Sequence, residues 1–468
     1  MNKYKYLVKN FGLLTLSSFG TKILSFVLIP LYTRMLTTSE YGTYDYYSTT
    51  VSLAIPLLTL NIVEAVMRFA LDKKNDPKDI FSIGIRKIFM SIFFFTFLVI
   101  LNVYFKLINI FVQYAGFLII LYISMLVYDL LSQFARGIEQ IKYVAVAGAI
   151  NTISLLFFNI YFLIYQKIGL KGYFLANCLS LIIPSIYYMY VLKIWNYFTL
   201  KTNKLIEKDM LSYSKPLVFN TIAWWINNVS DRYVVTWICG VAANGIYSVA
   251  YKIPSILNVL QSIFNQAWMI SAVKEFDSDG SRFYSKIYNL YNIGMVIMCS
   301  LLLVFNKVIA RLLFADSFYM AWKYAPFLMI SVVFGALSGL LGGVFSAAKQ
   351  SKIIAITTLL GAGINVVLNV LLVFIWGPIG AAISTMISYF IVWVARIKMI
   401  KTTVDLYIDL PIDILAYCLL VCQATVALVL GNTYFYVSIQ MICFLILIVL
   451  YHRSLLKAYR VLISKMKG

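Results

Sequence analysis

Acidic residues, histidine and several catalytic motifs are scarce or absent in this sequence. It has 18 Asp and Glu against 39 Lys and Arg, and its single histidine, His452, excludes a histidine cluster for a metal ion. It lacks the Gly-x-x-x-x-Gly-Lys-[Ser/Thr] pattern that cradles a nucleotide phosphate. No predicted outer loop exceeds roughly 20 residues, too short to fold over a polymerising or hydrolytic site. These absences predict no catalytic residues, no metal and no cofactor, and they favour transport over enzymatic chemistry.

Disulfides and a cleavable signal peptide are not expected either. All six cysteines lie in or at the ends of apolar segments, without a metal-ligand spacing or a pair in an outer loop. We interpret them as small packing residues. The first apolar run is long enough to span a membrane and leads into further spans, so it does not resemble a cleavable signal.

Hydrophobic residues are abundant. They make up 62% of the 468 residues, whereas charged residues make up 12%. Segments of about 20 apolar residues can cross a bilayer as helices, and the alternating pattern of a membrane β-barrel is absent. The sequence therefore predicts an all-α polytopic membrane protein. The net charge of +21 does not indicate nucleic acid, because the Lys and Arg residues cluster in short loops between apolar segments.

We predict fourteen transmembrane helices with both termini in the cytoplasm. Most Lys and Arg residues fall in the loops that this orientation places inside, as the positive-inside rule requires. The predicted outer loops hold only Lys106, Lys167, Lys171, Lys307, Arg311 and Lys323. The first predicted helix covers about 10–34, and the second follows residue 41 and ends near 70. The others cover about 86–105, 109–134, 143–165, 172–194, 216–238, 243–273, 284–305, 324–347, 353–376, 379–399, 412–430 and 434–451.

Similarity between the two halves predicts an internal repeat. Three features recur in order: Gly-x-Tyr at Gly42 and again 203 residues later at Gly245, Gln140-Ile141-Lys142 and Gln350-Ser351-Lys352, and the glycine pairs Gly169/Gly172 and Gly377/Gly380. Each half has six spans and begins inside, so the repeats run parallel and a substrate site is expected between them. We predict a lobe over 1–195, a cytoplasmic amphipathic connection over 196–215, a second lobe over 216–400, and two extra helices with a basic tail over 401–468.

Basic residues inside predicted spans are the first candidates for a functional site. A charge at bilayer depth costs roughly 2.5–3.5 kcal/mol, so such residues usually face a water-filled cavity. Lys22 shares one face of the helix over 10–34 with Thr15, Ser18 and Ser25, and Arg34 ends that helix. The alternative for Lys22 is a structural role, bonded to a neighbouring helix.

The second half has a similar group around Asp231, Arg232 and Lys252. Lys252 adjoins a polar stripe in the helix over 243–273, formed at steps of four and three by Tyr251, Ser255, Asn258, Ser262 and Asn265. In lipid, such a stripe must face protein or water. Hydrogen bonding between helices explains parts of it. The alternative for Asp231 and Arg232 is a structural ion pair between helices.

Further acidic residues lie in the first half. Asp45, near the outer end of the second helix, is the expected partner of a base in the first helix. Glu64 and Asp129 are either proton or sodium sites for energy coupling, or they neutralise nearby bases such as Arg68 and Arg136. The second interpretation is the simpler one.

Several motifs, taken in order, resemble one family. The opening stretch is NFGLLTLSSFGTKILSFVLIPLYTRMLTTSEYGTYDYYST, and the second half contains NNVSDRYVV, VAANGIYSVAYKI, LLFADSFYMAWKYAP and AAKQSK. These segments resemble the bacterial polysaccharide flippases, the Wzx-like branch of the multidrug/oligosaccharidyl-lipid/polysaccharide exporter superfamily. The resemblance covers about residues 10–400.

The resemblance implies a flippase that moves an undecaprenyl-diphosphate-linked oligosaccharide across the cytoplasmic membrane by alternating access through a cationic central cavity. It implies diphosphate or sugar contacts at Lys22, Arg34, Arg232 and Lys252, with Asp45 and Asp231 as counter-charges. Asn258 and Asn265 are further candidate contacts. Membrane lipids and a polysaccharide polymerase are the expected partners, and a proton or sodium gradient is the candidate energy source.

Two other functions are considered. A multidrug exporter of the same fold is the main alternative, although cationic drugs call for a cavity dominated by Asp and Glu. A membrane-embedded glycan polymerase would need a large outer loop. The polymer that a flippase would serve, O-antigen, capsule or a teichoic-type chain, is not specified by the sequence.

Overall fold

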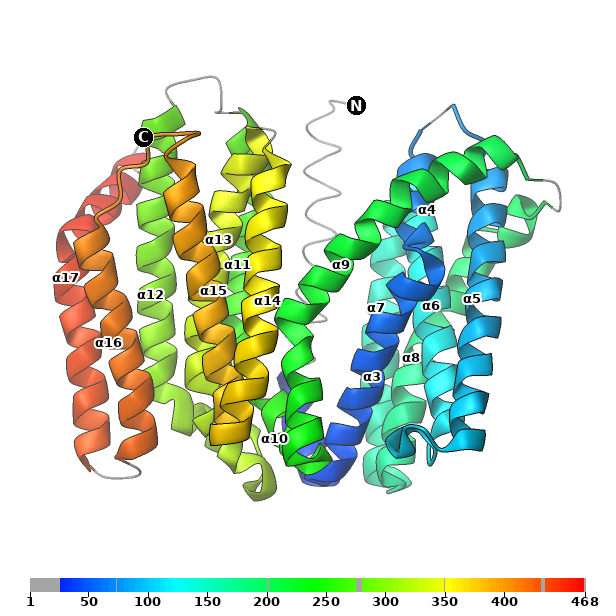
Figure 1. Cartoon of the computed structure of the whole chain (residues 1–468), viewed down its shortest axis with the longest axis horizontal. Helices are drawn as coiled ribbons and strands as arrows, with labels where there is room; N and C mark the ends of the chain where they lie inside the picture. Colours follow the sequence, from blue (N-terminus) through cyan, green and yellow to red (C-terminus); the bar gives the residue numbers. More distant parts are fainter. Residues whose placement is uncertain are drawn as a thin grey trace. The chain divides into compact units, whose positions relative to one another are not determined.

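In the part of the chain that the structure describes, all regular secondary structure is helical, which confirms the all-α prediction (Figure 1). The structure is a computed structural model, and it describes residues 26–72, 74–199, 202–274, 280–348, 350–430 and 434–466. The chain divides into two compact units, unit 1 (Met1–Trp225) and unit 2 (Ile226–Gly468).

Unit 1 contains the helices of the first half. They are α2 (Ile29–Met35), α3 (Thr38–Thr59), α4 (Ile62–Ala70), α5 (Pro77–Phe105), α6 (Ala115–Gly137), α7 (Ile141–Asn159) and α8 (Gly169–Val191). Short helices η1 (Asn109–Phe111), η2 (Ile160–Tyr165) and η3 (Ile194–Tyr197) follow α5, α7 and α8. A capping box begins α3, in which Thr37 and Glu40 satisfy each other's backbone N–H groups. The core of unit 1 is formed largely by apolar faces of α3 to α8.

Unit 2 contains the helices of the second half and the C-terminal pair. They are α10 (Val241–Ala250), α11 (Ser255–Lys274), α12 (Gly280–Leu313), η4 (Asp316–Lys323), α13 (Ala325–Ala347), α14 (Ser351–Trp376), α15 (Pro378–Ile400), α16 (Leu410–Val429) and α17 (Tyr434–Met466). The long helix α9 (Lys204–Cys239) contributes its first part to unit 1 and its last part to unit 2. The part of the predicted connection from Lys204 onward and the predicted seventh helix therefore form one continuous helix.

Ten helices of the described residues are long and apolar enough to cross a membrane, or eleven if the bent pair α3 and α4 counts as one span. The chain is thus a multi-pass membrane protein. The other three predicted spans do not meet these criteria. The helix over 10–34 lies mostly outside the described residues, and the span within α9 is more polar. The remaining span is divided into α10, which is apolar but only 10 residues long, and α11. The total of fourteen stays a prediction.

The second and eighth predicted helices are both interrupted. The helix axis bends by 63° between α3 and α4, where Leu60 and Asn61 adopt left-handed conformations with φ of 53° and 55°. Between α10 and α11 the chain forms turns over 251–254 and resumes as a helix after Pro254. Proline has no N–H group for the hydrogen-bond ladder of a helix. Pro56 lies shortly before the first interruption, and Pro254 is the last residue of the second. The repeat therefore includes the interruption.

The glycine pairs of the repeat have matching geometry. Gly169 and Gly377 precede or begin α8 and α15 with φ of +54° and +62°, where glycine carries no Cβ penalty. A Cβ at Gly172 would lie 2.8 Å from Ile168 Cγ1, and one at Gly380 would lie 2.0 Å from the backbone oxygen of Leu372. Both pairs allow a sharp turn and a close approach of the chain, which supports the predicted parallel repeat.

The first turns of α9 are held against α5 by ion pairs. Arg86 donates a hydrogen bond to the carboxylate of Glu207, and Lys87 Nζ lies 2.7 Å from Glu207 Oε1. The hydrogen bond from Lys87 lowers the pKa of the Glu207 carboxyl, and the charge of Arg86 lowers it further. Met210, one turn further on, is fully buried. The predicted amphipathic connection is thus anchored by charges and by an apolar contact.

We expect this anchor to weaken in acid. The folded pKa of Glu207 lies below its unfolded value of about 4.3. The ion pairs therefore contribute to stability above about pH 4.3, and this contribution is lost as the pH falls through the folded pKa. Partly exposed pairs of this kind contribute about 0.2–1 kcal/mol. The protection factors of the amides in the first α9 turns, that is, their exchange rates relative to the intrinsic rate at each pH, should fall in acid, and Glu207→Gln should remove most of that pH dependence. Asp209→Asn, at an exposed neighbour, is the control; the same pH dependence in Glu207→Gln as in the wild type would contradict this.

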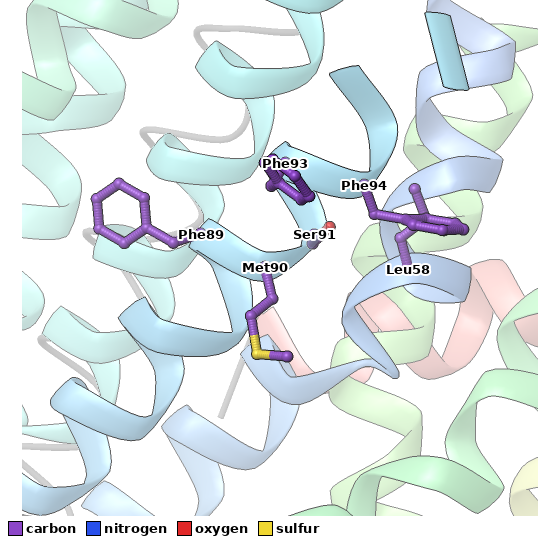
Figure 2. Close-up of a pocket in the computed structure, with 6 residues that line it drawn as sticks. All are labelled: Leu58, Phe89, Met90, Ser91, Phe93 and Phe94. Carbon is purple, nitrogen blue, oxygen red and sulfur yellow. The ribbon is translucent and has the colours of Figure 1, made fainter. Parts of the chain in front are cut away.

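An apolar groove of about 570 Å³ lies on unit 1 between α3 and α5 (Figure 2). Its lining residues are Leu58 of α3 and Phe89, Met90, Ser91, Phe93 and Phe94 of α5. Phe93 is 76% exposed, as expected of a side chain that faces lipid. The hydroxyl of Ser91 hydrogen-bonds Tyr122 of α6. The groove thus presents apolar surface, and we do not assign a charged substrate group to it.

Polar contacts fasten the C-terminal helix α17 to α12 and the two C-terminal helices to each other. Lys307 of α12 is 8% exposed, and its Nζ lies 4.4 Å from the ring centroid of Trp322 and 3.9 Å from that of Tyr436 on α17. Such cation–π contacts stabilise a buried ammonium. Gln423 of α16 and Gln440 of α17 each donate to the other's backbone oxygen, at 3.1 and 2.7 Å. The α12 helix extends past the predicted end at 305, so Lys307 lies in a helix and not in an outer loop.

Candidate functional site

The candidate site in unit 2 is built around Asp231, which is 2% exposed near the end of α9. The chain turns back at Gly240, so that α10 places Tyr247 beside it. The hydroxyl of Tyr247 donates to Asp231 Oδ2 at 2.7 Å, and the hydroxyl of Tyr251 donates to the same oxygen. The backbone N–H of Arg232 donates to Oδ1 at 2.9 Å. A buried carboxylate thus has three donors, which offset the cost of removing it from water.

One base, Arg232, lies at this carboxylate, and a second, Lys252, follows one of its tyrosine ligands in the chain. The guanidinium carbon of Arg232 lies 5.0 Å from the ring centroid of Tyr251, and the Arg232 side chain is partly exposed. Lys252 follows Tyr251 at the interruption between α10 and α11, and it is also partly exposed. Its backbone oxygen accepts a hydrogen bond from the hydroxyl of Ser255, the first residue of α11. Arg232 and Asp231 of α9 thus lie beside Tyr251, and Lys252 is the next residue of the chain, at the interruption between α10 and α11.

A hydrogen-bond network extends from α9 to α14 and α15. Asn228 accepts a hydrogen bond from the hydroxyl of Tyr389 at 2.8 Å, and the hydroxyl of Ser230 donates to Asn365 Oδ1 at 3.3 Å. Asn369 donates to the same oxygen of Asn365 at 2.8 Å, while Asn365 Nδ2 donates to Thr385 at 3.4 Å. These contacts fix the α9 face that carries Asp231 relative to two neighbouring helices of unit 2.

Arg396 of α15 is 6% exposed and bonds neutral groups. Its Nε donates to Thr357 Oγ1 at 3.0 Å, its Nη2 to Thr358 Oγ1 at 3.0 Å, and its Nη1 to the backbone oxygen of Ser338 at 2.6 Å. A Cβ on Gly342 would lie 3.0 Å from Nη1, so the small residue makes room for the guanidinium. Arg396 thus joins α13, α14 and α15, and we assign it a structural role.

The predicted polar stripe is only partly preserved. Asn258 lies on α11 and is exposed. Asn265 is partly buried, and its Nδ2 would be 3.6 Å from a Cβ on Gly339 of α13, so it faces that helix. Because α11 begins anew after Pro254, its residues do not continue the face on which Tyr251 lies. Their role as substrate contacts stays a prediction.

The candidates of unit 1 lie on α2 and α3. Arg34 is exposed in the last turn of α2, where a cation favours the negative end of the helix dipole. Asp45 lies in α3 and is partly exposed. Lys22 lies outside the described residues. The predicted pairing of Asp45 with a base of the first helix therefore stays a prediction.

Glu64 and Asp129 are neighbours on α4 and α6. Gln133 Nε2 of α6 lies 3.5 Å from Glu64 Oε1, and the charges nearest to Asp129 include Glu64 and Arg136. Glu64 is exposed, whereas Asp129 is partly buried. Two carboxyl groups thus lie near one base, which is compatible with both the neutralising role and the coupling role that the sequence allowed.

The sequence reasoning missed some of the structural partners of these residues. It included Tyr251 in the polar stripe but did not identify Tyr247 as a ligand of Asp231. It also did not single out Asn365 and Asn369, although asparagines four residues apart in an apolar helix share one face. The four-residue spacing of Asn365 and Asn369 was the signal in the sequence for this polar face.

A family model described as "Polysaccharide biosynthesis protein" matches residues 7–273, which is more than half of the chain. A curated relative is an uncharacterized membrane protein of Methanocaldococcus jannaschii, 22% identical over 301 residues. That match covers 58% of this chain and 56% of the relative, so the chain spans little more than half the length of the relative it matches.

Solved structures share the fold. The lipid II flippase MurJ, in an inward closed conformation, has a TM-score of 0.69 at 14% identity, over 94% of this chain and 99% of that chain. An inward-facing multidrug resistance MATE family transporter of the MOP superfamily has a TM-score of 0.61 at 14% identity, over 83% of this chain and 95% of that chain. At these identities the likeness shows the fold and not the substrate.

Proposed function

Because this chain belongs to the polysaccharide biosynthesis protein family, we propose that it is a flippase for an undecaprenyl-diphosphate-linked oligosaccharide. It moves the repeat unit of a surface polysaccharide from the inner to the outer leaflet of the bacterial cytoplasmic membrane by alternating access through a cationic central cavity. O-antigen, capsule and teichoic-type chains are the candidate polymers. We place both termini in the cytoplasm, and we propose no enzymatic activity and no cofactor.

The observation that carries this proposal is that Arg232 lies beside the buried Asp231 and that Lys252 directly follows Tyr251, a ligand of Asp231, at the helix interruption. A diphosphate is anionic, so Arg232 and Lys252 would offset the cost of removing it from water. The α11 helix also begins at this interruption, and the N-terminus of a helix favours an anion. Interrupted helices commonly form substrate sites in transporters. The counter-charge Asp231 keeps the bases in place between transport cycles.

Energy for directional movement is proposed to come from a proton or sodium gradient, because the sequence has no nucleotide-binding motif. The carboxyl groups that could bind the coupling ion are Asp45, Glu64, Asp129 and Asp231. In unit 1, Glu64 and Asp129 are supported by their proximity across α4 and α6.

A multidrug exporter is the second candidate, because a MATE family transporter shares this fold. Its cationic substrates would require a site with more acid than base, and the group of Asp231, Arg232 and Lys252 has the opposite balance. A glycan polymerase is less consistent with the sequence, because no long outer loop is predicted. Removing the protein distinguishes the three functions, because each predicts a different accumulation of lipid-linked intermediates.

Deletion of the gene for this chain tests the proposal. We expect lipid-linked repeat units to accumulate in the inner leaflet, out of reach of an externally added glycan-labelling enzyme, with loss of surface polymer. Restoring the gene should restore both. Accumulation of single repeat units in the outer leaflet would indicate a polymerase. Unchanged polymer together with increased sensitivity to cationic drugs would indicate an exporter, and either result would refute the flippase.

A further inference from the structure

The C-terminal helix pair carries a buried carboxyl group that the proposed translocation site does not use. Asp413 lies in the first turn of α16 and is 2% exposed. Its Oδ1 accepts a hydrogen bond from the hydroxyl of Tyr451 on α17 at 2.9 Å. Its Oδ2 has no hydrogen-bond partner among the described residues. One oxygen of this carboxyl group is therefore buried and unbonded.

A second polar group at the same place is also only half bonded. Asn292 of α12 is fully buried, and its Oδ1 accepts a hydrogen bond from the hydroxyl of Tyr417 on α16 at 2.8 Å. Its Nδ2 has no partner within the described part of the chain. Asn292 neighbours both Asp413 and Tyr451. Buried polar atoms without partners are rare in proteins, and two of them together call for an explanation.

The groups around Asp413 supply no described positive charge. The titratable neighbours are the exposed Asp409 and, on α16, Tyr417. The α17 helix supplies Tyr451 and then His452, which is exposed and bonds the backbone oxygen of Val449. On α12 the titratable neighbour of Asp413 is Tyr288. The α13 helix also packs against α16, and it has no titratable residue in its sequence. An ionised carboxylate in such surroundings is unfavourable, whereas a neutral carboxyl group is accommodated.

We propose that Asp413 is a proton-binding site formed by α12, α16 and α17. The amide of Asn292 allows both states, because rotating it by half a turn exchanges its oxygen and nitrogen. With the proton bound, the O–H at Oδ2 donates to the amide oxygen of Asn292, whose nitrogen donates to the Tyr417 hydroxyl. With the proton released to water at the nearby end of α16, the nitrogen of Asn292 donates to the charged Oδ2. No atom is then left unbonded in either state.

Asp413 itself lies outside the two predicted six-helix lobes, whereas Asn292 belongs to the second lobe, and the site does not depend on the proposed function. Release of the proton leaves a negative charge between α12 and the C-terminal pair, so it loosens their packing at this end. The three helices lie side by side, with α16 and α17 in orange and red in Figure 1. The site would thus make the attachment of α16 and α17 sensitive to pH.

Carbodiimide labelling of the purified full-length protein tests the proposal. Dicyclohexylcarbodiimide adds to a protonated carboxyl group in apolar surroundings and leaves an N-acylurea, which mass spectrometry locates on a peptide. We expect labelling at Asp413 that falls about tenfold per pH unit above its midpoint, as the protonated fraction falls. Asp409, exposed on the same helix end, should not be labelled. Absence of labelling at Asp413 at every pH, or labelling with the same pH dependence as the reagent's own decay, would overturn the proposal.

A matched substitution gives a second readout on the folded protein. Asp413→Asn keeps an acceptor for Tyr451 but cannot release a proton, so the difference between its melting temperature and that of the wild type should change with pH. Asp409→Asn should follow the wild type. Parallel melting profiles for wild type and Asp413→Asn across the pH range would contradict a proton site. Neither measurement needs a substrate, so failure here leaves the flippase proposal separately testable.

Discussion

Replacing Arg232 with alanine is expected to abolish surface polysaccharide while leaving the protein in the membrane. The guanidinium lies against the Tyr251 ring beside the buried carboxylate of Asp231. Its removal takes away a base that can hold a phosphate group through two hydrogen bonds. Hydrogen bonds to charged groups contribute about 1.5–3 kcal/mol each, so binding should fall by roughly ten- to a hundredfold for each bond lost. Immunodetection of surface polymer, with membrane level as reference, measures this.

Lys252→Ala should have the same effect, and Lys252→Arg should be milder because the charge is kept. Lys352→Ala, at an exposed position in the first turn of α14, is the matched control and should be neutral. Normal polymer in both Arg232→Ala and Lys252→Ala would remove these bases from the site. Equal loss in Lys252→Ala and Lys252→Arg would indicate that shape matters more than charge.

Gly380→Ala is expected to produce the largest loss of stability among single small substitutions. A Cβ there would lie 2.0 Å from the backbone oxygen and 2.8 Å from the backbone nitrogen of residues in α14, Leu372 and Val373. Backbone atoms cannot rotate away as a side chain can, so α14 and α15 must separate. Overpacking costs about 1–3 kcal/mol and occasionally more. The melting temperature of the purified protein should therefore fall by several degrees.

Gly363→Ala is the control for this experiment. Gly363 lies in the same helix pair, and a Cβ there meets nothing within 4 Å. Because alanine favours a helix over glycine by up to about 1 kcal/mol, this substitution should be neutral or slightly stabilising. Equal melting temperatures for Gly380→Ala and Gly363→Ala would show that the close contact of α14 and α15 does not limit stability.

The class of fold and the family could be predicted from the sequence. Long apolar segments separated by basic loops specify membrane helices, and the ordered motifs led to a family assignment that the comparison confirms. The glycine pairs Gly169/Gly172 and Gly377/Gly380 predicted the repeat, because only glycine suits a turn with positive φ followed by a close approach. These features are local, so the sequence is sufficient for them.

The interruption near Lys252 was not predicted, although Pro254 was a visible signal. A polar stripe at helical spacing predicted one helix over 243–273, and the periodicity outweighed a single proline. Asn258 and Asn265 consequently lie on a separate helix from Tyr251. Pro254 ends a helix here, whereas Pro184 and Pro216 lie inside α8 and α9, so proline alone does not tell a helix end from a tolerated position.

The partners of buried charges could not be predicted either, because they depend on tertiary packing. Asp231 was assigned to a base, whereas two tyrosine hydroxyls across a helical hairpin also hold it. Lys307 was assigned to a loop, but aromatic rings from η4 and α17 surround its ammonium group. Arg396 of α15 bonds hydroxyl and carbonyl oxygens from two other helices, α13 and α14. Helical periodicity gives the face of a residue, but not which neighbour meets that face.

The central claim is that the bases beside Asp231 serve the passage of a lipid diphosphate. The most direct measurement is the rate at which the purified protein, reconstituted in liposomes, moves an undecaprenyl-diphosphate-linked oligosaccharide to the opposite leaflet. We predict movement by the wild type that is lost when Arg232 and Lys252 are both replaced by alanine and retained in Lys352→Ala. Equal rates for the wild type and the double variant, or no movement of this lipid by a folded wild-type protein, would contradict the account.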